Sequence, residues 1–280
     1  MFERQTTALI SRQARLALTM CAAILIAVWL FPVAWMIMTS LKPSPDITSR
    51  VPVFRFRPTF EHYAALLNTY HFRQFFATSF LVAALTTIIT MVLASLAAYA
   101  LGCMEPAGGK NVAMWILSQR MLPPIAVVIP FFILFRQYNL IDTYPGLMIV
   151  YLVPALPFAV WLLRSFFLDT PPEVREAALL DGLRHPQILR RVVAPMAGPG
   201  IAVTAIFTFI FTWNEFLFAL FLTSERATTV PVGISQLILA YQVLWGEVSA
   251  AGTLALVPLI PVVFYLQRHI VRGMTLGAVK

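Results

Sequence analysis

Six long apolar runs, separated by shorter polar segments, dominate the hydropathy pattern of this chain. They cover residues 16–40, 76–101, 112–135, 146–167, 198–222 and 250–267. A helix needs about 20 predominantly apolar residues to cross a bilayer, and each run is close to that length or longer. The pattern predicts an all-α, polytopic membrane protein with six transmembrane helices and both termini on the same side.

Composition supports a membrane protein. Of the 280 residues, 60% are hydrophobic and 11% are charged, with a mean hydropathy of +0.81. Soluble domains average about 45–50% apolar and about 25% charged residues. Arginines before the first run imitate a signal peptide, but the run is too long for one and lacks a small-residue cleavage site. We therefore expect it to remain as the first transmembrane helix.

The distribution of basic residues predicts the orientation, because Lys and Arg concentrate in cytoplasmic loops. With a cytoplasmic N-terminus, the inner side collects Arg4, Arg12, Arg15, Lys110, Arg164, Arg175, Arg184, Arg190, Arg191, Arg268, Arg272 and Lys280. The outer side collects Lys42, Arg50, Arg55, Arg57, Arg73, Arg136 and Arg226, most of them in the long loop 41–75. Long loops weigh less in this rule, so both termini are predicted to be cytoplasmic. The net charge of +8 is explained in this way rather than by nucleic-acid binding.

The long outer loop is too polar and too rich in proline to cross the membrane. Its residues 60–76 place Tyr63, Leu66, Leu67 and Tyr70 at roughly helical spacing, which predicts a short amphipathic helix on the outer face.

A polar, helix-forming segment lies between the fourth and fifth apolar runs. Thr170 is a candidate cap for a helix that begins at the following prolines, with Glu173 completing a capping box. The helix is expected to continue to about Leu180, and Gly182 to end it in a left-handed conformation. We expect a second short helix over residues 186–193, stopped by Pro195 before the fifth run.

The residue types of this segment suit docking onto a partner. The candidate docking residues are Glu176, Ala177, Ala178, Leu179, Leu180, Asp181 and Gly182. The two alanines allow close approach of a partner backbone, the leucines give an apolar face, and the acidic residues supply charged contacts. An amphipathic helix that touches only lipid and its own chain is the alternative interpretation.

The same residues carry a family resemblance. The stretch Glu176-Ala177-Ala178-Leu179-Leu180-Asp181-Gly182, followed by Val192-Val193-Ala194-Pro195, resembles the EAA signature of the membrane subunits of binding-protein-dependent ABC importers. The sequence departs from that signature at Leu183, Val192 and Ala194, each time with one apolar residue for another. The resemblance implies a MetI-like permease fold whose cytoplasmic coupling helix, between transmembrane helices 4 and 5, docks into an ATPase subunit.

Other segments resemble the carbohydrate branch of this family, typified by the six-span second permease of the maltose transporter. They are residues 139–147, Leu156-Pro157-Phe158, Trp213-Asn214-Glu215-Phe216 and residues 273–280. The loop 102–111 departs from relatives in carrying only Lys110 as a basic residue. The apolar runs and the basic residues predict a cytoplasmic N-terminus at 1–15, a first transmembrane helix at 16–40, an outer, periplasmic loop at 41–75 and a cytoplasmic tail at 273–280. The resemblance implies that 76–272 is a permease core that includes the coupling segment 170–195.

The chain lacks the sequence of a nucleotide-hydrolysing enzyme. The stretch 108–111 is the nearest approach to a phosphate-binding loop, but Met104 and Asn111 replace required residues. No cofactor or metal site is expected on this chain, and the four histidines are scattered. The resemblance implies partners in a bacterial inner membrane. They are two copies of an ATPase that binds ATP and Mg²⁺, a second and different permease, a solute-binding protein and membrane lipid, with no nucleic acid.

Charged residues inside membrane segments are costly and are candidates for function. Glu215, with its neighbours Trp213 and Asn214, offers polar groups and an aromatic face suited to a sugar path. Internal pairing, or a place at the membrane interface, is the alternative interpretation for Glu215. Arg120 in the third run is either a side chain that reaches back to the interface or part of an inner gate.

The sequence therefore favours the permease subunit of an ABC importer for a sugar or polyol. The alternatives are an importer for another small solute and an ion-coupled secondary carrier, which needs carboxylates near the membrane midplane. An integral membrane enzyme has no catalytic constellation to support it.

Overall fold

The computed structural model describes residues 12–238, 243–262 and 264. These residues are almost entirely helical, and their only β-type pairing is an isolated antiparallel bridge between Ile238 and Val243. The all-α prediction is confirmed for this part of the chain. The predicted cytoplasmic tail 273–280, most of the predicted segment 1–15 and the end of the sixth apolar run lie outside the described residues.

The chain divides into two compact units. The first unit contains residues 1–70 and 238–254, and the second contains residues 71–237 and 255–280. Each unit is described by itself.

The first unit contains the helices α2 (Arg12–Ser40), α3 (Ser44–Ile47), α4 (Glu61–Asn68) and most of α15 (Trp245–Leu256). The apolar side chains of α2 are largely exposed, as expected for a helix that faces lipid or a partner. The predicted amphipathic helix forms as α4, but it ends at Asn68, because residues 69–71 turn before the next helix. It buries His62 and Leu66.

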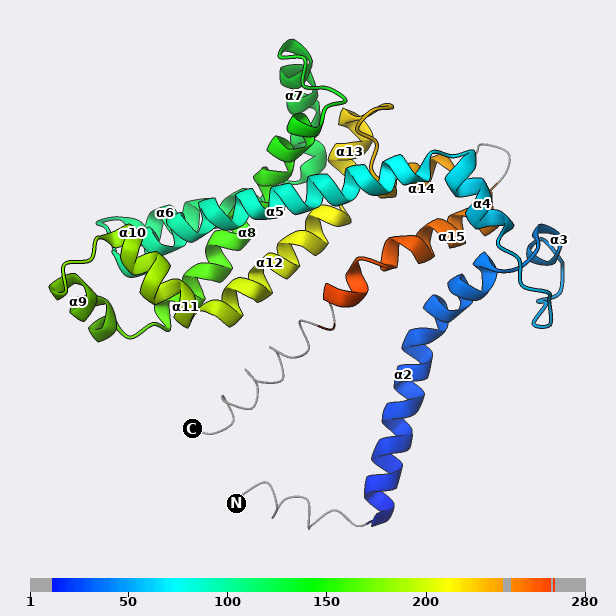
Figure 1. Cartoon of the computed structure of the whole chain (residues 1–280), viewed down its shortest axis with the longest axis horizontal. Helices are drawn as coiled ribbons and strands as arrows, with labels where there is room; N and C mark the ends of the chain where they lie inside the picture. The colour runs from blue at the N-terminus through cyan, green and yellow to red at the C-terminus, as the bar shows by residue number, and fades with distance from the viewer. Residues whose placement is uncertain (1–11, 239–242, 263, 265–280) are drawn as a thin grey trace. The chain divides into compact units, whose positions relative to one another are not determined.

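Three long helices form the body of the second unit (Figure 1). They are α5 (Phe72–Cys103), α8 (Tyr144–Leu168) and α12 (Gly198–Trp213). Small and hydroxyl-bearing residues let them approach closely, as is common between membrane helices. A Cβ atom at Gly200 on α12 would overlap the ring of Phe166 on α8, and the threonines of α12 donate their hydroxyl hydrogens to backbone carbonyls four residues earlier.

The structure contains four helices long and apolar enough to cross a membrane, or up to six if each of two bent pairs counts as one span. The third predicted span, at 112–135, is sharply bent. α6 (Gly109–Ser118) and the 3₁₀ turn η1 (Gln119–Met121) meet α7 (Pro124–Gln137) at a bend of 91°. Pro123 and Pro124 explain the break, because proline cannot donate a backbone hydrogen bond and disfavours helix in the residue before it.

The fifth and sixth runs also differ from expectation. The fifth run breaks after Trp213 and resumes as α13 (Leu217–Leu222), followed by α14 (Val230–Gln236). At its other end, residues 185–196 meet α12 at a bend of 87°. The last apolar helix begins at Trp245, before the predicted start near residue 250.

Candidate functional site

The predicted docking segment lies at one end of the second unit, beyond the C-terminal end of α5 (Figure 1). It consists of α9 (Pro172–Leu180), α10 (His185–Ile188), the π-helix η2 (Leu189–Val193) and the short α11 (Ala194–Met196). Such π-helical turns are rare and occur often at functional sites.

The end of α9 is a Schellman motif, as the sequence predicted for Gly182. Gly182 has φ of +80°, in the left-handed region. Its N–H donates to the carbonyl of Leu179 at 3.0 Å, and the N–H of Leu183 donates to the carbonyl of Ala178 at 3.1 Å. These bonds satisfy carbonyls that a helix terminus leaves free.

Two predictions about the ends of this segment are wrong. Thr170 does not cap α9: Pro171 holds the cap position without a side-chain hydrogen bond, and Thr170 is buried instead. Pro195 does not stop the second helix, because α11 continues to Met196 and the chain turns at Ala197. A proline in the first turn of a helix lacks only an N–H that would have no partner there.

α9 turns one face outward and one face inward. Leu180 is 90% exposed and Leu179 46% exposed, and Glu176 and Ala177 are also at the surface. Ala178 is 7% exposed and belongs to the unit's own core, with Ile188. The expectation that Ala178 offers itself to a partner is therefore corrected: its small side chain lets α9 pack onto its own chain. Asp181 and Gly182 are exposed at the turn.

Polar contacts tie this segment to the last turns of α5. Arg175 donates from Nη1 to the backbone carbonyl of Cys103 at 2.7 Å. The hydroxyl of Tyr99 lies 3.1 Å from Nδ1 of His185. The terminal carbonyls of α5 need such donors, and a guanidinium is a strong one. The segment is thus held to α5 by both packing and directed bonds.

Glu215 lies at the break between α12 and α13 and caps the second of these helices. Its Oε1 accepts from the N–H of Phe218 at 3.0 Å, and its Oε2 accepts from the N–H of Ala219 at 3.2 Å. A carboxylate at a helix N-terminus satisfies free backbone donors and complements the helix dipole. This agrees with the interpretation that Glu215 is paired internally.

The predicted trio of Trp213, Asn214 and Glu215 does not form one binding face. Trp213 is 2% exposed, and its ring packs against Phe76 and Phe209, at centroid distances of 5.4 Å and 6.0 Å. Asn214 is exposed and donates from Nδ2 to the carbonyl of Ile210 at 2.8 Å. Trp213 is therefore a core residue rather than an aromatic surface for a solute.

Arg120 and Glu215 line the same small cavity, of about 50 Å³, with Tyr151 and Phe211 among the other lining residues. The guanidinium carbon of Arg120 lies 4.9 Å from the ring centre of Phe158 and 5.8 Å from that of Phe211. The side chain is thus seated on aromatic faces by cation–π contacts. Phe158 and Phe211 were not assigned this role from the sequence. Phe211 precedes Glu215 by four residues, which places the two side chains on the same side of a helix. This spacing is the one sequence signal that could have placed Phe211 beside Glu215 in the cavity.

Asp142, in the turn between α7 and α8, organises the loop that follows α13. Its carboxylate accepts hydrogen bonds from the backbone N–H groups of residues 224–227, the shortest being those of Arg226 and Ala227, both 2.9 Å. Partial burial alone would raise the pKa of Asp142. The bonds from Ala227, Arg226, Ser224 and Glu225 together outweigh it, and the pKa lies below its ordinary value. Asp142 has φ of +57°, which Asp tolerates better than most residues.

Among the described residues, no group of three or more His, Cys, Asp or Glu side chains is arranged to hold a metal ion.

The chain is similar to transport proteins over nearly its whole length. Residues 94–276 match the family described as Binding-protein-dependent transport system inner membrane component. The probable ABC transporter permease protein y4oR of Sinorhizobium fredii is 36% identical over 266 residues, covering 95% of this chain and 96% of that protein. The trehalose/maltose transport system permease protein MalG of Thermococcus litoralis is 34% identical over 270 residues, covering 95% of this chain and 97% of that protein.

The fold has a solved counterpart. A chain in the crystal structure of a bacterial ABC transporter involved in the import of the acidic polysaccharide alginate matches with a TM-score of 0.77 and 22% sequence identity, covering 92% of this chain and 98% of that chain. At this identity the likeness concerns the fold, and the predicted MetI-like permease fold is confirmed.

Proposed function

Because the chain belongs to the family of inner membrane components of binding-protein-dependent transport systems, we propose that it works as the permease subunit of an ABC importer for a sugar or polyol. The relative from Thermococcus litoralis is named for trehalose and maltose transport, which supports a carbohydrate solute. As a transport permease, the chain is not an enzyme.

The observation that carries the proposal is the two-sided character of α9. Its outward face presents Leu180 at 90% exposure, beside Glu176 and Ala177. An apolar side chain left this open on a polar helix suits insertion into a groove of a partner protein. The partner we propose is an ATPase subunit, present in two copies and carrying ATP and Mg²⁺, because this sequence has no phosphate-binding loop of its own.

The inward face of α9 gives the mechanical connection. Ala178 packs into the core shared with α5 and α8, and Arg175 bonds to the end of α5. α5 in turn packs along α8 and α12. When the ATPase dimer closes, α9 and η2 move as one body with the end of α5. Packed helices shift between discrete arrangements rather than bending continuously, so this motion switches the second unit between two packings.

The cavity beside Arg120 is the proposed contribution of this chain to the solute path. Arg120 has no carboxylate within ion-pair distance among the described residues, and its guanidinium rests on Phe158 and Phe211. Hydrogen-bond donors next to aromatic faces suit a ligand that has both hydroxyl groups and apolar ring faces. Glu215 acts here by fixing the break between α12 and α13. Asn214 is exposed at the same break, and the buried ring of Trp213 anchors the end of α12 in the core.

The proposed topology follows the positive-inside rule. The termini (1–15 and 273–280) and the coupling segment 170–195 are cytoplasmic in this proposal, and the loop 41–75 faces the periplasm. The first transmembrane helix at 16–40 precedes the permease core at 76–272. A second, different permease completes the path, and a solute-binding protein delivers the solute from outside. The family's own description, binding-protein-dependent, supports the solute-binding protein, and its words 'inner membrane' support the membrane location.

The test is to tag this chain, extract it in mild detergent from its native membrane, and identify the proteins that copurify. We expect a stoichiometric ATPase and a second permease, and sugar-dependent ATP hydrolysis once the complex is placed in nanodiscs with its binding protein. A lone chain that transports solute on an ion gradient without an ATPase would replace this proposal with a secondary carrier. An intact complex stimulated only by a non-carbohydrate solute would retain the importer and overturn the solute class.

A further inference from the structure

A cavity in the first unit is lined by residues that take no part in the coupling segment or in the Arg120 cavity. It has a volume of about 330 Å³ and lies between the last turns of α2 and the start of α15. Its polar and aromatic lining consists of Trp35, Thr39, Lys42, Trp245 and Ser249. Cavities of this size hold small ligands or headgroups.

Lys42 is the unusual residue of this cavity. Its side chain is 3% exposed, and its Nζ lies 4.7 Å from the ring centre of Trp35 and 5.6 Å from that of Phe56. In the described part of the chain, no carboxylate lies within 4.0 Å of this ammonium group. Burying an unpaired cation is costly, and the cation–π contacts offset only part of that cost. The ammonium group of Lys42 therefore has no negatively charged partner among the described residues of the cavity.

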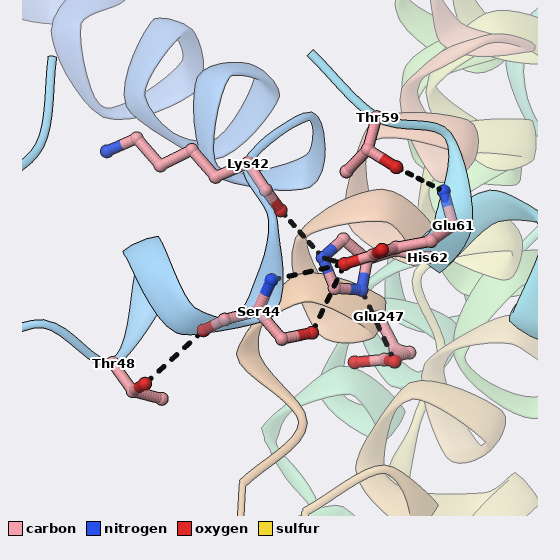
Figure 2. A network of polar contacts seen from close by, with 7 residues as sticks. All are labelled: Lys42, Ser44, Thr48, Thr59, Glu61, His62 and Glu247. Atoms are coloured by element: carbon pink, nitrogen blue, oxygen red, sulfur yellow. Dashed lines mark hydrogen bonds and ion pairs between the residues drawn. The ribbon is translucent and has the colours of Figure 1, made fainter. Parts of the chain in front are cut away.

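The neighbouring carboxylates are engaged elsewhere (Figure 2). Glu61 accepts from the backbone N–H of Ser44 at 3.1 Å, and Glu247 lies 3.3 Å from Nδ1 of His62. Nε2 of His62 contacts the backbone carbonyl of Lys42 at 2.8 Å. Figure 2 shows that this contact holds the Lys42 backbone toward His62 while the Lys42 side chain extends away from the network. The network thus fixes the direction of Lys42 without neutralising it.

The position of the cavity indicates the source of the anion. It lies where the long apolar helix α2 gives way to a polar loop, which is the boundary between hydrocarbon and water. Trp and Lys side chains concentrate at that level, with their polar ends toward the lipid headgroups. Hydroxyl groups of Thr39 and Ser249 supply further hydrogen-bond donors in the cavity.

We propose that this cavity binds the phosphate of a membrane phospholipid headgroup, with the ammonium of Lys42 as its counter-ion. The acyl chains then lie along the exposed apolar side chains of α2. The lipid acts as a structural ligand that joins the ends of α2 and α15. This inference does not depend on the identity of the transported solute.

The test uses the delipidated, purified importer complex and short-chain phosphatidylglycerol as the probe. Native mass spectrometry and the shift in unfolding temperature report binding. We expect Lys42→Gln to weaken lipid binding about tenfold or more, as expected for the loss of a charge-assisted contact, and Lys42→Arg to retain most of it. Arg50→Gln, which removes the same charge from an exposed position in the same loop, is the matched control and should bind as the unaltered complex does.

Other results would overturn the proposal. Unchanged lipid binding by Lys42→Gln would remove Lys42 as the counter-ion, and loss of the second permease with that variant would identify a partner carboxylate instead. Inorganic phosphate that binds and stabilises the complex as well as the lipid does would show a free-anion site. If Lys42→Gln does not fold, Thr39→Val provides the same comparison at a neutral position, and unchanged lipid affinity in that variant would count against the site.

Discussion

The guanidinium of Arg175 donates a hydrogen bond to the backbone carbonyl of Cys103 at 2.7 Å, so α9 is fastened to the last residue of α5. This bond is directional and charge-assisted, and it joins residues far apart in the sequence. α5 is the longest described helix of the second unit and packs against α8 and α12. In our proposal, a displacement of α9 is passed through this bond to α5, and from α5 to α8 and α12, which line the cavity beside Arg120.

Replacement of Arg175 by Met should uncouple ATP hydrolysis from transport. Met keeps an unbranched apolar stem but cannot donate to Cys103. A hydrogen bond from a charged group is worth about 1.5–3 kcal/mol, so uptake should fall about tenfold or more. The ATPase should still copurify, because the outward face of α9 is unchanged. The control is Lys110→Met, an exposed cation outside the coupling segment. Equal uptake by Arg175→Met and this control would show that the bond transmits nothing.

Replacement of Gly182 should act through the backbone conformation. A side chain in the left-handed region costs roughly 1–2 kcal/mol, less for Asn than for Ala. We expect Gly182→Ala to speed amide hydrogen exchange at residues 182 and 183 and to weaken ATPase binding, with Gly182→Asn intermediate. Open space surrounds the site of the added Cβ, so a steric clash cannot explain the effect. Identical exchange in Ala and Asn variants would contradict the Schellman assignment.

Removal of the Asp142 carboxylate should loosen the loop 224–227. Asp142→Ala leaves four backbone N–H groups without their acceptor. The buried N–H of Ala227 costs about 1–3 kcal/mol when unsatisfied, whereas residues 224–226 are exposed and their N–H groups can bond to water. Asp142→Asn should have an intermediate effect, because an amide keeps one acceptor oxygen. Hydrogen exchange of these amides in the purified complex is the measurement. Asp169→Ala, an exposed acid at the end of α8, is the matched control.

The same contact predicts a pH dependence. The folded-state pKa of Asp142 is below its unfolded value, so its contribution to stability is fully present above the unfolded value of about 3.9. The contribution is lost as the pH falls through the lower, folded-state pKa. Exchange of the 224–227 amides, corrected for intrinsic rates, should be flat from pH 5 to 8 and should accelerate only below about pH 4. Acceleration near pH 6 would point to a different titrating group.

Replacement of Arg120 should affect solute handling but leave the ATPase attached. Arg120→Met removes the cation from Phe158 and Phe211 while preserving most of the side-chain length. We expect uptake to fall severalfold and the concentration for half-maximal uptake to rise, since the site loses its donors. Arg136→Met, at the exposed end of α7, serves as the control. If both variants transport alike, the cavity plays no part in the solute path.

The sequence predicted the bounds of those helices whose apolar runs are uniform. It did not predict the angles at which broken helices meet, because packing against other helices sets those angles. The helices α2, α5 and α8 follow their apolar runs closely. The size of the bend in the apolar run 112–135 could not be predicted from the sequence. Pro123 and Pro124 mark where the helix breaks, but the angle depends on the helices against which the chain packs after the break. Length and hydropathy alone cannot supply that information.

Adjacent residues were also grouped too readily into sites. Trp213 and Glu215 are near neighbours in sequence, but α12 ends between them, so one enters the core and the other caps α13. Ala178 has the composition of a docking residue, yet a small side chain is equally suited to the inner face of α9. The pairing of His62 with Glu247 joins distant segments, and nothing local in the sequence indicates it.

The central claim is that the exposed face of α9 docks the ATPase. The most direct measurement is the amount of ATPase that copurifies with the tagged chain carrying Leu180→Arg. Leu180 is 90% exposed, so the change should leave the fold of this chain intact. Leu67→Arg, in α4 of the first unit, is the control for an exposed leucine. We predict that Leu180→Arg loses most of the ATPase and nearly all solute uptake while the second permease stays bound, and that Leu67→Arg retains the ATPase. Full retention of the ATPase by Leu180→Arg would contradict the assignment of α9 as the coupling helix.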